Sequence, residues 1–566
     1  MNNQYGHNYR GMICVCLILL AFAGLMMRSL YLCYFYDHKR FAPITRQYAT
    51  NLKTASYRGN IYDRHKHSLA VSVQRPSAYI DKKFKPTLKQ LGQIALILDV
   101  PKNKIKKLIK KKRAFAYLKR KISPKQKARL ERLELKGLAF QTEPHRVYPN
   151  GQSAAELLGF VDIDNKGLAG VEKQFDRQLT GQITKVSPAV DALRRRILLD
   201  NKSSIPDHPG NNIILSIDQV IQEIAEEALK WGVERSLAKG GWVVVADPNT
   251  GAILAAANYT PYSGKAKKLQ RNRAFVDIWE PGSLTKAMLL TSALDKKAVS
   301  LNQEIDCSKG KMKIGKHTIH DTHLVKDATI TDVIVHSSNV CAYKIAEKVG
   351  AKNYYNHLID FGIADKKYSF QFPGYTAGRI SHYKKWRPIR FANIAFGQGF
   401  LTNTIELVRA FSTVGNGGRL FDPYLLERVE TDSGVIQYQK KPSFTQLFEP
   451  HVAQQIKGVL EKVVQEGSGR NAKIKGLGVG GKTGTAQKTD PGKRGYAKGK
   501  YLASFFGFTP TKSTPHLTIG VVIDTPGKAP HYGGLWAAPV FKKIAKTTLK
   551  YLNLSLIHIS EPTRPY

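Results

Sequence analysis

Serine and lysine side chains three residues apart form the most chemically suggestive pattern in this sequence. A serine hydroxyl can attack a carbonyl carbon, and a neighbouring neutral lysine can take its proton. The 566-residue chain contains four such Ser-x-x-Lys pairs: Ser236–Lys239, Ser283–Lys286, Ser308–Lys311 and Ser381–Lys384. Because the spacing recurs, it does not by itself identify a nucleophile. Each pair has to be judged by the element that carries it.

The pair Ser283–Lys286 has the most favourable setting. "EPGS" (280–283) is typical of a turn, and "LTKAMLLTSALDKK" follows with helical spacing. A serine at a helix start lies near backbone amides and the positive end of the helix dipole, which stabilise developing negative charge. Lys286 follows one turn later on the same face. Burial beside a second cation would lower its pKa enough for it to act as a base.

Two shorter motifs follow in order along the chain. Residues 337–339 form a Ser-x-Asn motif, although residues 300–302 match it too. "GGKTGTAQK" contains Lys482-Thr483-Gly484, the only Lys-Thr-Gly in the chain, followed by Thr485. A strand edge there can pair with an extended peptide. Lys482 can supply the second cation, and the two threonine hydroxyls can hold a carboxylate.

One apolar segment near the N-terminus predicts a membrane anchor. Residues 11–27, "GMICVCLILLAFAGLMM", carry no charge, and aromatic residues follow Arg28. With Arg28 reaching to the lipid surface, residues 11–35 can span a bilayer, and residues 1–10 precede them as a short tail. Positive charges flank the segment on both sides, at Arg10 and at Arg28, Lys39 and Arg40, so they leave its orientation open. The alternative is a signal peptide cleaved near "AFA" (21–23). The apolar stretch continues past that site, so we expect an uncleaved anchor.

Composition and charge restrict the partners. Lys and Arg number 88 against 43 Asp and Glu, a net charge of +45, which favours an anionic partner such as lipid headgroups, a wall polymer or nucleic acid. The densest basic run, residues 102–129, predicts one or two solvated basic helices, and nothing resembles a nucleic-acid module. No cysteine pair has metal-binding spacing. Cys307 and Cys341 could form a disulfide in an oxidising compartment, but buried free thiols are the expectation.

The pattern of elements predicts an α+β fold. Residues 211–218 resemble a strand, residues 219–236 a helix and residues 241–258 a hairpin, while two more strands are expected near residues 501–510 and 516–526. Strands at both ends of a domain with helices between them indicate a sheet covered by helices. Residues 36–55 read as a polar stalk, and short strands and basic helices are expected over residues 57–181. Residues 554–566 contain "LSLIHISEPTR", which matches the translation of a sequencing-library adapter, so we expect them to be an artefact.

Ser-x-x-Lys, Ser-x-Asn and Lys-Thr-Gly in this order resemble the motifs of penicillin-binding proteins and serine β-lactamases. "RGNIYDR" (58–64) and "GLAGVEKQFDRQLTG" (167–181) are similar to the N-terminal pedestal motifs of class B penicillin-binding proteins. "RNR" (271–273), "HYGG" (531–534) and "AAPVF" (537–541) resemble the FtsI-type cell-division transpeptidase. One departure is "DRHKH" (63–67), because the family usually has a glycine after Asp-Arg-x.

The resemblance implies a penicillin-binding transpeptidase fold over residues 211–553, an antiparallel sheet covered by helices. An elongated pedestal of the dimerisation type over residues 36–210 and one transmembrane helix would precede it. Ser338 would pack or cap a helix. Structural ion pairs are expected in the pedestal from Arg58, Asp63, Arg64 and Glu172.

The implied activity is that of a peptidoglycan D,D-transpeptidase, a serine acyltransferase. Ser283 would attack a stem peptide with Lys286 as base, Ser337 would relay a proton, and Asn339 would hold Lys286 and the substrate amide. The other implied roles fall on the third motif. Lys482 would be a further catalytic residue and would orient the substrate carboxylate together with Thr483 and Thr485, while Gly484 would keep the substrate-binding strand edge open. The backbone amides of Ser283 and Thr485 would form the oxyanion hole.

No metal or cofactor is implied. The implied partners are peptidoglycan stem peptides, the membrane, a SEDS-family glycosyltransferase and other division proteins, with β-lactams as inhibitors and no nucleic acid. The implied location is the inner membrane, crossed once, with the N-terminus inside and the catalytic domain in the periplasm.

Other functions remain open at this point. An elongation-type class B protein is the nearest alternative, and a membrane-anchored penicillin sensor or a bifunctional protein with a glycosyltransferase domain is more distant. A β-lactamase would need a base to hydrolyse its acyl-enzyme, and class A enzymes use a glutamate between the second and third motifs. Residues 366–405, the expected window, contain no Asp or Glu.

Overall fold

The computed structural model describes residues 5–34, 52–54, 57–111, 115–181, 184–186, 209–261, 271–322, 328–365, 367–368, 370–489 and 495–553. The chain divides into two compact units, Met1–Ser56 with Gln182–His208, and Tyr57–Gly181 with Pro209–Tyr566. The first unit contains helix α1 (Tyr5–Tyr34) and the antiparallel strands β1 (Leu52–Thr54) and β6 (Thr184–Val186). Most of the expected stalk, and the expected adapter segment 554–566, lie outside the described residues.

Helix α1 contains a stretch long and apolar enough to cross a membrane. Gly11–Tyr31 has 21 residues with a mean hydropathy of 2.3, and its side chains are exposed. At a rise of about 1.5 Å per residue this stretch is about 30 Å long, which is the thickness of a bilayer's hydrocarbon core. The helix therefore has the length and composition of an anchor or of a signal sequence.

The larger unit contains a five-stranded antiparallel sheet with the strand order β18-β19-β20-β8-β9. Its strands are β8 (Gly240–Ala246), β9 (Ile253–Tyr259), β18 (Gly480–Thr489), β19 (Tyr496–Thr509) and β20 (Leu517–Asp524). The predicted hairpin is β8–β9, and the two predicted C-terminal strands are β19 and β20. Strands from both ends of the domain thus meet in one sheet, as the order of elements predicted.

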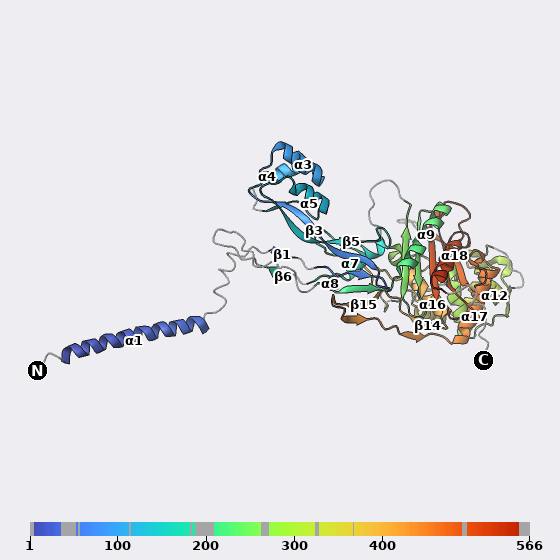
Figure 1. Cartoon of the computed structure of the whole chain (residues 1–566). Coiled ribbons are helices and arrows are strands. Elements are labelled where there is room, and N and C mark those ends of the chain that lie inside the picture. Colours follow the sequence, from blue (N-terminus) through green and yellow to red (C-terminus); the bar gives the residue numbers. More distant parts are fainter. Residues whose placement is uncertain are drawn as a thin grey trace, which may run out of the picture. The chain divides into compact units, whose positions relative to one another are not determined.

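Helices cover both faces of this sheet (Figure 1). Val243 and Val245 of β8 belong to the apolar cluster shared with α9 (Gln219–Ser236) and α18 (Gly533–Tyr551). On the other face α16 (Thr404–Gly415) packs against the sheet, where the ring of Phe411 lies 5.8 Å from that of Phe506. Successive side chains of a strand point to opposite faces of the sheet. Strands that lie between two apolar layers therefore bury the side chains of both faces.

Helix α11 (Thr285–Asp295) lies in the centre of the helical layer. Its residues from Thr285 to Leu294 are all buried. The surrounding helices are α12 (Ile330–Val335), α13 (Asn339–Val349), α14 (Ala351–Asp360), α15 (Pro388–Ala395) and α17 (Pro450–Gln465). A helix that is covered on every side buries its polar side chains together with its apolar ones.

A seven-stranded sheet forms the pedestal, with the order β16-β15-β7-β2-β3-β4 and β5 paired with β3. Its strands are β2 (Ile61–Tyr62), β3 (Ser68–Ile80), β4 (Ala116–Lys119), β5 (Leu138–Val147), β7 (Asn212–Leu215), β15 (Leu426–Glu430) and β16 (Ile436–Gln439). At 13 and 10 residues, β3 and β5 are longer than the short strands expected. Three of the strands come from beyond residue 210, so this sheet joins the pedestal to the C-terminal part of the chain.

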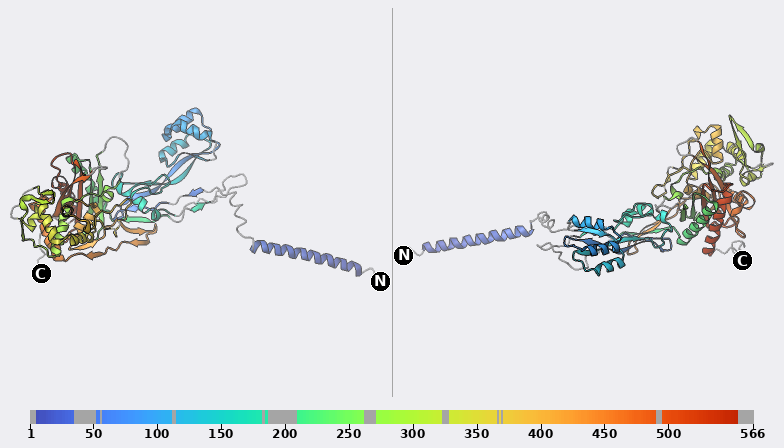
Figure 2. Two further views of the ribbon diagram at one scale, coloured as in Figure 1. Left: turned by 180° about the vertical axis from the view of Figure 1, so that it is seen from behind. Right: turned by 90° about the horizontal axis from the view of Figure 1, so that it is seen from above.

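A small helical lobe lies at the end of β3 that is remote from β2 (Figure 2). It consists of α3 (Leu88–Leu98), α4 (Lys102–Lys110), β4 and α5 (Pro124–Glu131). Ile94, Leu98, Ile105 and Leu130 are fully buried in its own apolar core. The basic run predicted as one or two helices thus forms two helices with a strand between them.

The remaining α-helices and strands are short. They are α6 (Ala155–Leu158), α7 (Gly170–Gln174), α8 (Asp176–Leu179), α10 (Arg273–Val276), and the strand pairs β10 (Glu304–Ile305) with β13 (Ala328–Thr329), β11 (Lys311–Ile314) with β12 (His317–His320), and β14 (Arg419–Phe421) with β17 (Phe444–Gln446).

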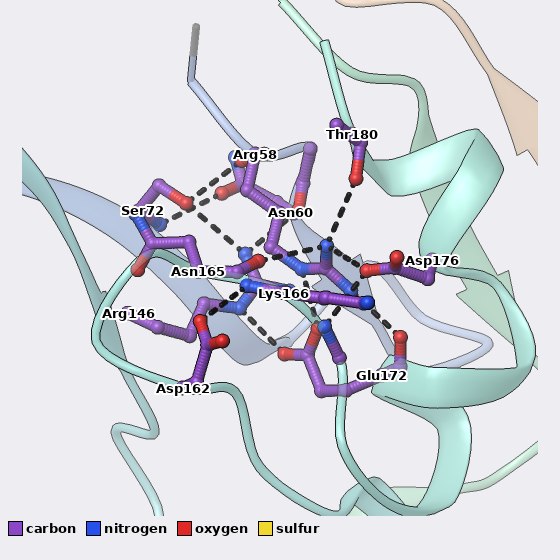
Figure 3. Close-up of polar contacts among 12 residues, drawn as sticks. Arg58, Asn60, Ser72, Arg146, Asp162, Asn165, Lys166, Glu172, Asp176 and Thr180 are labelled. Atoms are coloured by element: carbon purple, nitrogen blue, oxygen red, sulfur yellow. Dashed lines mark hydrogen bonds and ion pairs between the residues drawn. The ribbon is translucent and has the colours of Figure 1, made fainter. Parts of the chain in front are cut away.

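The two pedestal motifs meet in a buried ion-pair network (Figure 3). Glu172 accepts from Arg58 Nε and from Arg146 Nε, each at 2.6 Å, and all three side chains are almost fully buried. Arg58 also pairs with Asp176 at 2.7 Å. A buried carboxylate between two guanidinium groups is stable only with all partners present. The predicted structural role of Arg58 and Glu172 is confirmed.

Asp63 organises the turn in which this chain departs from the family pattern. Its carboxylate accepts the backbone amides of His65 at 2.8 Å and His67 at 2.7 Å. Lys66, in the place of the usual glycine, has φ of 65°. This left-handed backbone conformation is unfavourable for residues with a Cβ. Lys66 therefore makes the turn less stable than glycine would, while the turn keeps its shape.

Candidate active site

Ser283 lies in a 3₁₀ turn, η1 (Gly282–Leu284), that leads directly into α11, as the sequence predicted. Gly282 has φ of 55°, and its amide donates to Gly397 O at 2.9 Å. A Cβ at Gly282 would lie 3.1 Å from Thr485 O, so the turn lies closely against strand β18. The backbone of the first motif therefore lies beside that of the third.

Lys286 joins the first motif to the second. Its Nζ donates to the carbonyl oxygen of Ser337 at 2.7 Å, to Ser337 Oγ at 3.2 Å and to Asn339 Oδ1 at 2.8 Å. From β18, Lys482 Nζ donates to the same Ser337 Oγ at 3.0 Å. The structure therefore brings the three motifs together around one serine hydroxyl, with two lysines bonded to it.

Both lysines are fully buried, and this sets their electrostatics. Burial, and after it the charge of Lys482, hold the pKa of Lys286 well below its ordinary 10.5, whereas the charge of Asp321 acts in the opposite direction. Burial alone lowers the pKa of Lys482 to about 7. A neutral lysine can accept a proton, so this lowered pKa suits Lys286 to act as a base.

Burial also separates the four Ser-x-x-Lys pairs. Lys286 is fully buried, whereas Lys239, Lys311 and Lys384 are exposed. Burial removes the hydration of an ammonium group and favours the neutral amine that can take a proton. Only the pair at Ser283 therefore has the environment that an activated nucleophile needs.

Asp321 positions the second motif and was not among the residues predicted from the sequence. Its carboxylate accepts the backbone amide of Asn339, the amide of Val340 at 3.0 Å and the hydroxyl of Ser338 at 2.6 Å. Ser338 Oγ in turn accepts the amide of Cys341 at 3.0 Å, so the predicted cap is confirmed. Asp321 lies 16 residues before Ser337, at the end of a hairpin, and no sequence spacing marks it.

The expectation of free thiols at Cys307 and Cys341 is wrong. The two residues form a disulfide across 34 residues of chain, and both are buried. Cys341 lies on the first turn of α13, two residues after Asn339. The cross-link therefore ties the helix that carries the second motif to the neighbouring loop.

Strand β18 is an edge strand of the sheet, as the third motif requires. Thr483 Oγ1 lies 2.8 Å from Ser468 Oγ, and Thr485 Oγ1 accepts the amide of Gly533 at 3.3 Å. A Cβ at Gly484 would lie 2.4 Å from Ser504 Oγ. Glycine is therefore needed at position 484 for close packing, while its neighbours orient their hydroxyl groups.

The three motifs line a cavity of about 1070 Å³. Ser283, Ser337, Asn339, Thr483 and Thr485 contribute to its wall. A volume of several hundred Å³ or more is typical of sites that take a substantial ligand. A serine at a helix start, two buried lysines and an edge strand around one cavity define a site for serine acyl transfer to or from a peptide.

Comparison with known proteins agrees with this class. Residues 241–546 match the family model for the penicillin-binding protein transpeptidase domain, and residues 53–215 match that for the penicillin-binding protein dimerisation domain. The chain belongs to the penicillin-binding proteins, and its pairing of a dimerisation with a transpeptidase domain makes it a class B member.

Relatives match over most of the chain. The probable peptidoglycan D,D-transpeptidase PenA of Neisseria meningitidis serogroup A is 34% identical, with 97% of this chain and 92% of that protein covered. Peptidoglycan D,D-transpeptidase FtsI of Escherichia coli is 31% identical, with 89% and 85% covered. The crystal structure of penicillin binding protein 3 from Mycobacterium tuberculosis, complexed with aztreonam, has a TM-score of 0.69 at 24% identity, with 88% and 97% covered, and so shares the fold.

Proposed function

We propose that this protein is a peptidoglycan D,D-transpeptidase that works through an acyl-enzyme on Ser283. Ser283 Oγ attacks the penultimate D-alanine carbonyl carbon of a stem peptide, and its proton passes to neutral Lys286. The C–N bond then breaks, and the terminal D-alanine leaves with a proton relayed by Ser337. An amine of a second stem peptide displaces the serine and forms the cross-link. The convergence of Lys286 and Lys482 on Ser337 Oγ carries this assignment.

The third motif is suited to bind the acyl donor. In this proposal the backbone amides of Ser283 and Thr485 stabilise the oxyanion, and the close approach of Gly282 to Thr485 supports their pairing. Thr483 and Thr485, with Lys482 behind them, orient the terminal carboxylate. Gly484 keeps strand β18 close to its neighbours so that its edge can pair with an extended peptide.

Acylation by a penicillin tests the nucleophile directly. β-Lactams resemble the D-Ala-D-Ala end, so we expect a fluorescent penicillin to label the wild-type chain and to leave Ser283→Ala unlabelled. Ser381→Ala is a matched control, because Ser381 belongs to another Ser-x-x-Lys pair whose lysine is exposed. Labelling of Ser283→Ala, or loss of labelling in the control alone, would contradict the assignment.

We further propose septal cell-wall synthesis as the role in the cell, together with a SEDS-family glycosyltransferase and other division proteins. Identity to FtsI and the motifs "RNR", "HYGG" and "AAPVF" support this role. Accumulation of a fluorescent fusion at midcell is the expected result, and a side-wall pattern would favour elongation instead.

The proposed arrangement along the chain follows from this role. Residues 1–10 form a cytoplasmic tail, residues 11–35 an inner-membrane anchor, residues 36–210 the pedestal and residues 211–553 the periplasmic transpeptidase domain. Protease added to spheroplasts should digest the domain after residue 36 and spare the tail. Full protection of both parts would contradict this arrangement.

A hydrolytic β-lactamase activity is the competing function for the same site. Glu466 is the one acidic side chain among the described residues that line the cavity. We expect nitrocefin to acylate the protein once and to turn over slowly. Rapid multiple turnover that is lost in Glu466→Gln would identify a hydrolase instead.

A further inference from the structure

The helical lobe at the end of β3 is far more basic than the rest of the chain. Residues 81–111 and 115–137, here called the basic lobe, contain eighteen Lys and Arg side chains against four Asp and Glu. Among the described residues, one ion pair lies within the lobe, between Lys127 and Glu131 at 3.4 Å. Most of these charges therefore face solvent without an acidic neighbour and attract anionic surfaces.

Helix α3 differs from the rest of the lobe because its outer face is apolar. Its sequence, "LKQLGQIALIL", contains a single charged residue, Lys89. Leu91 and Ile94 fill the core of the lobe, whereas Leu88 and Leu96 on the outer face are 79% and 77% exposed. A surface helix normally turns charged residues outward. Exposed leucines do not stabilise the folded chain, so the fold alone does not explain why leucine occupies these two positions.

Leu88, Gly92 and Leu96 follow at intervals of four and therefore share one stripe of α3. The two leucines are about 12 Å apart along the helix axis. Between them lies the ammonium group of Lys102, since a Cβ at Gly92 would lie 3.4 Å from Lys102 Nζ. The outer face of α3 thus presents two apolar side chains with a cation between them and Lys89 beside them.

We propose that the basic lobe docks onto an anionic lipid surface through this face of α3. Leucines that enter the acyl boundary while lysines bind headgroups are the chemistry of an interfacial helix. Residues 32–56 can extend over no more than about 90 Å, so a membrane-inserted α1 keeps Tyr57 within that distance of the bilayer. The inference rests on the proposed anchor and is independent of the chemistry at Ser283.

The experiment places an environment-sensitive fluorophore beside this face in the full-length protein. Gln93 is exposed on α3, and a nitrobenzoxadiazole label on Gln93→Cys reports its surroundings once Cys14, Cys16 and Cys33 are replaced by Ala. The protein is reconstituted into vesicles of phosphatidylcholine alone or with phosphatidylglycerol. We expect a blue shift and quenching by a lipid-borne quencher only with phosphatidylglycerol, and loss of both in 0.5 M NaCl, where charges are screened within about 4 Å.

Two variants test the contribution of the face itself. Leu88→Asn with Leu96→Asn should weaken docking roughly tenfold or more, because the apolar area that enters the lipid is lost. Lys102→Gln should weaken it about fivefold, the effect of one charge at an anionic surface. Val435→Asn, at a 58% exposed apolar residue outside the lobe, is the matched control and should change nothing.

Several results would overturn the proposal. They are an identical label response in both vesicle types, an unchanged response in the leucine variant, and a stronger response to soluble polyphosphate than to the anionic vesicles. Flotation of the protein with both vesicle types tests the anchor separately, and penicillin labelling of every variant tests the fold and the active site. A failed anchor or a failed site is therefore distinguishable from a failed lobe contact.

Discussion

Replacing Lys482 by Met should move the pH dependence of acylation to higher pH. In the wild-type chain Lys482 and Lys286 both donate to Ser337 Oγ, at 3.0 and 3.2 Å. The charge of Lys482 is one of the two causes that lower the pKa of Lys286, and burial is the larger one. The variant removes the charge and leaves the burial. Lys286 should then hold its proton up to a higher pH than in the wild-type chain.

The size of this effect follows from the geometry. Two nitrogens bonded to one oxygen at these distances lie at most about 6 Å apart. Two unit charges at that distance repel by about 2.8 kcal/mol at an effective dielectric constant near 20. Since one pKa unit corresponds to about 1.4 kcal/mol, the acid limb of the acylation profile should move upward by about two pH units. The repulsion acts only below about pH 7, where Lys482 is charged.

Stopped-flow acylation with a fluorescent penicillin between pH 5 and 10 measures this limb. The position of the limb is the readout, because loss of a substrate contact at Lys482 lowers the rate at every pH without moving it. Lys488→Met is the matched control, since Lys488 lies on the same strand, is partly exposed and pairs with Asp524. An acid limb that stays within 0.3 pH units of the wild type, or moves to lower pH, would refute the electrostatic argument.

Three further predictions concern stability. Glu172→Gln removes the carboxylate shared by the buried guanidinium groups of Arg58 and Arg146, of which Arg58 keeps Asp176. It should lower the free energy of unfolding by about 3–5 kcal/mol, measured by urea denaturation, and a loss below 1 kcal/mol would contradict the network's role. Replacing Cys307 and Cys341 by Ala should lower the free energy of unfolding by about 4 kcal/mol, the chain-entropy value for a loop of this length. Equal melting temperatures of variant and wild type would argue against the cross-link. Lys66→Gly should raise the free energy of unfolding by about 1 kcal/mol, because glycine adopts the left-handed backbone conformation without strain. Lys66→Ala should not raise it, and equal melting temperatures for the two variants would exclude strain at this position.

The sequence predicted the parts of the site that depend on local order along the chain. A turn followed by helical spacing placed Ser283 at a helix start, and a glycine-rich run placed Lys482 on a strand. Asp321 could not be predicted in this way, because its bonds to Ser338 and Asn339 come from a hairpin whose approach to α13 is a tertiary contact. Such a contact is fixed by packing and leaves no periodic signal in the sequence.

The fold shows the same limit. The hairpin β8–β9 and helix α9 were predictable, since each is set by a turn or by an apolar period within one segment. The pedestal sheet was not, because β2 pairs in parallel with β7, about 150 residues later, and β15 and β16 join from beyond residue 425. The disulfide was missed for a related reason, since 34 residues separate two cysteines that the folded chain brings together.

The reactivity of the Ser-x-x-Lys pair depends on residues outside the motif. The pKa of Lys286 is lowered by burial because α11 is covered by surrounding helices, and its residues from Thr285 to Leu294 are all buried. The same spacing at Ser236, the last residue of α9, is followed by an exposed Lys239 and so lacks this burial. Burial of a lysine is unfavourable for folding whenever it must carry a charge. The packing of α11 therefore supplies the free energy that buries Lys286 and lowers its pKa. The Ser-x-x-Lys motif itself only places the two side chains on one face of the helix.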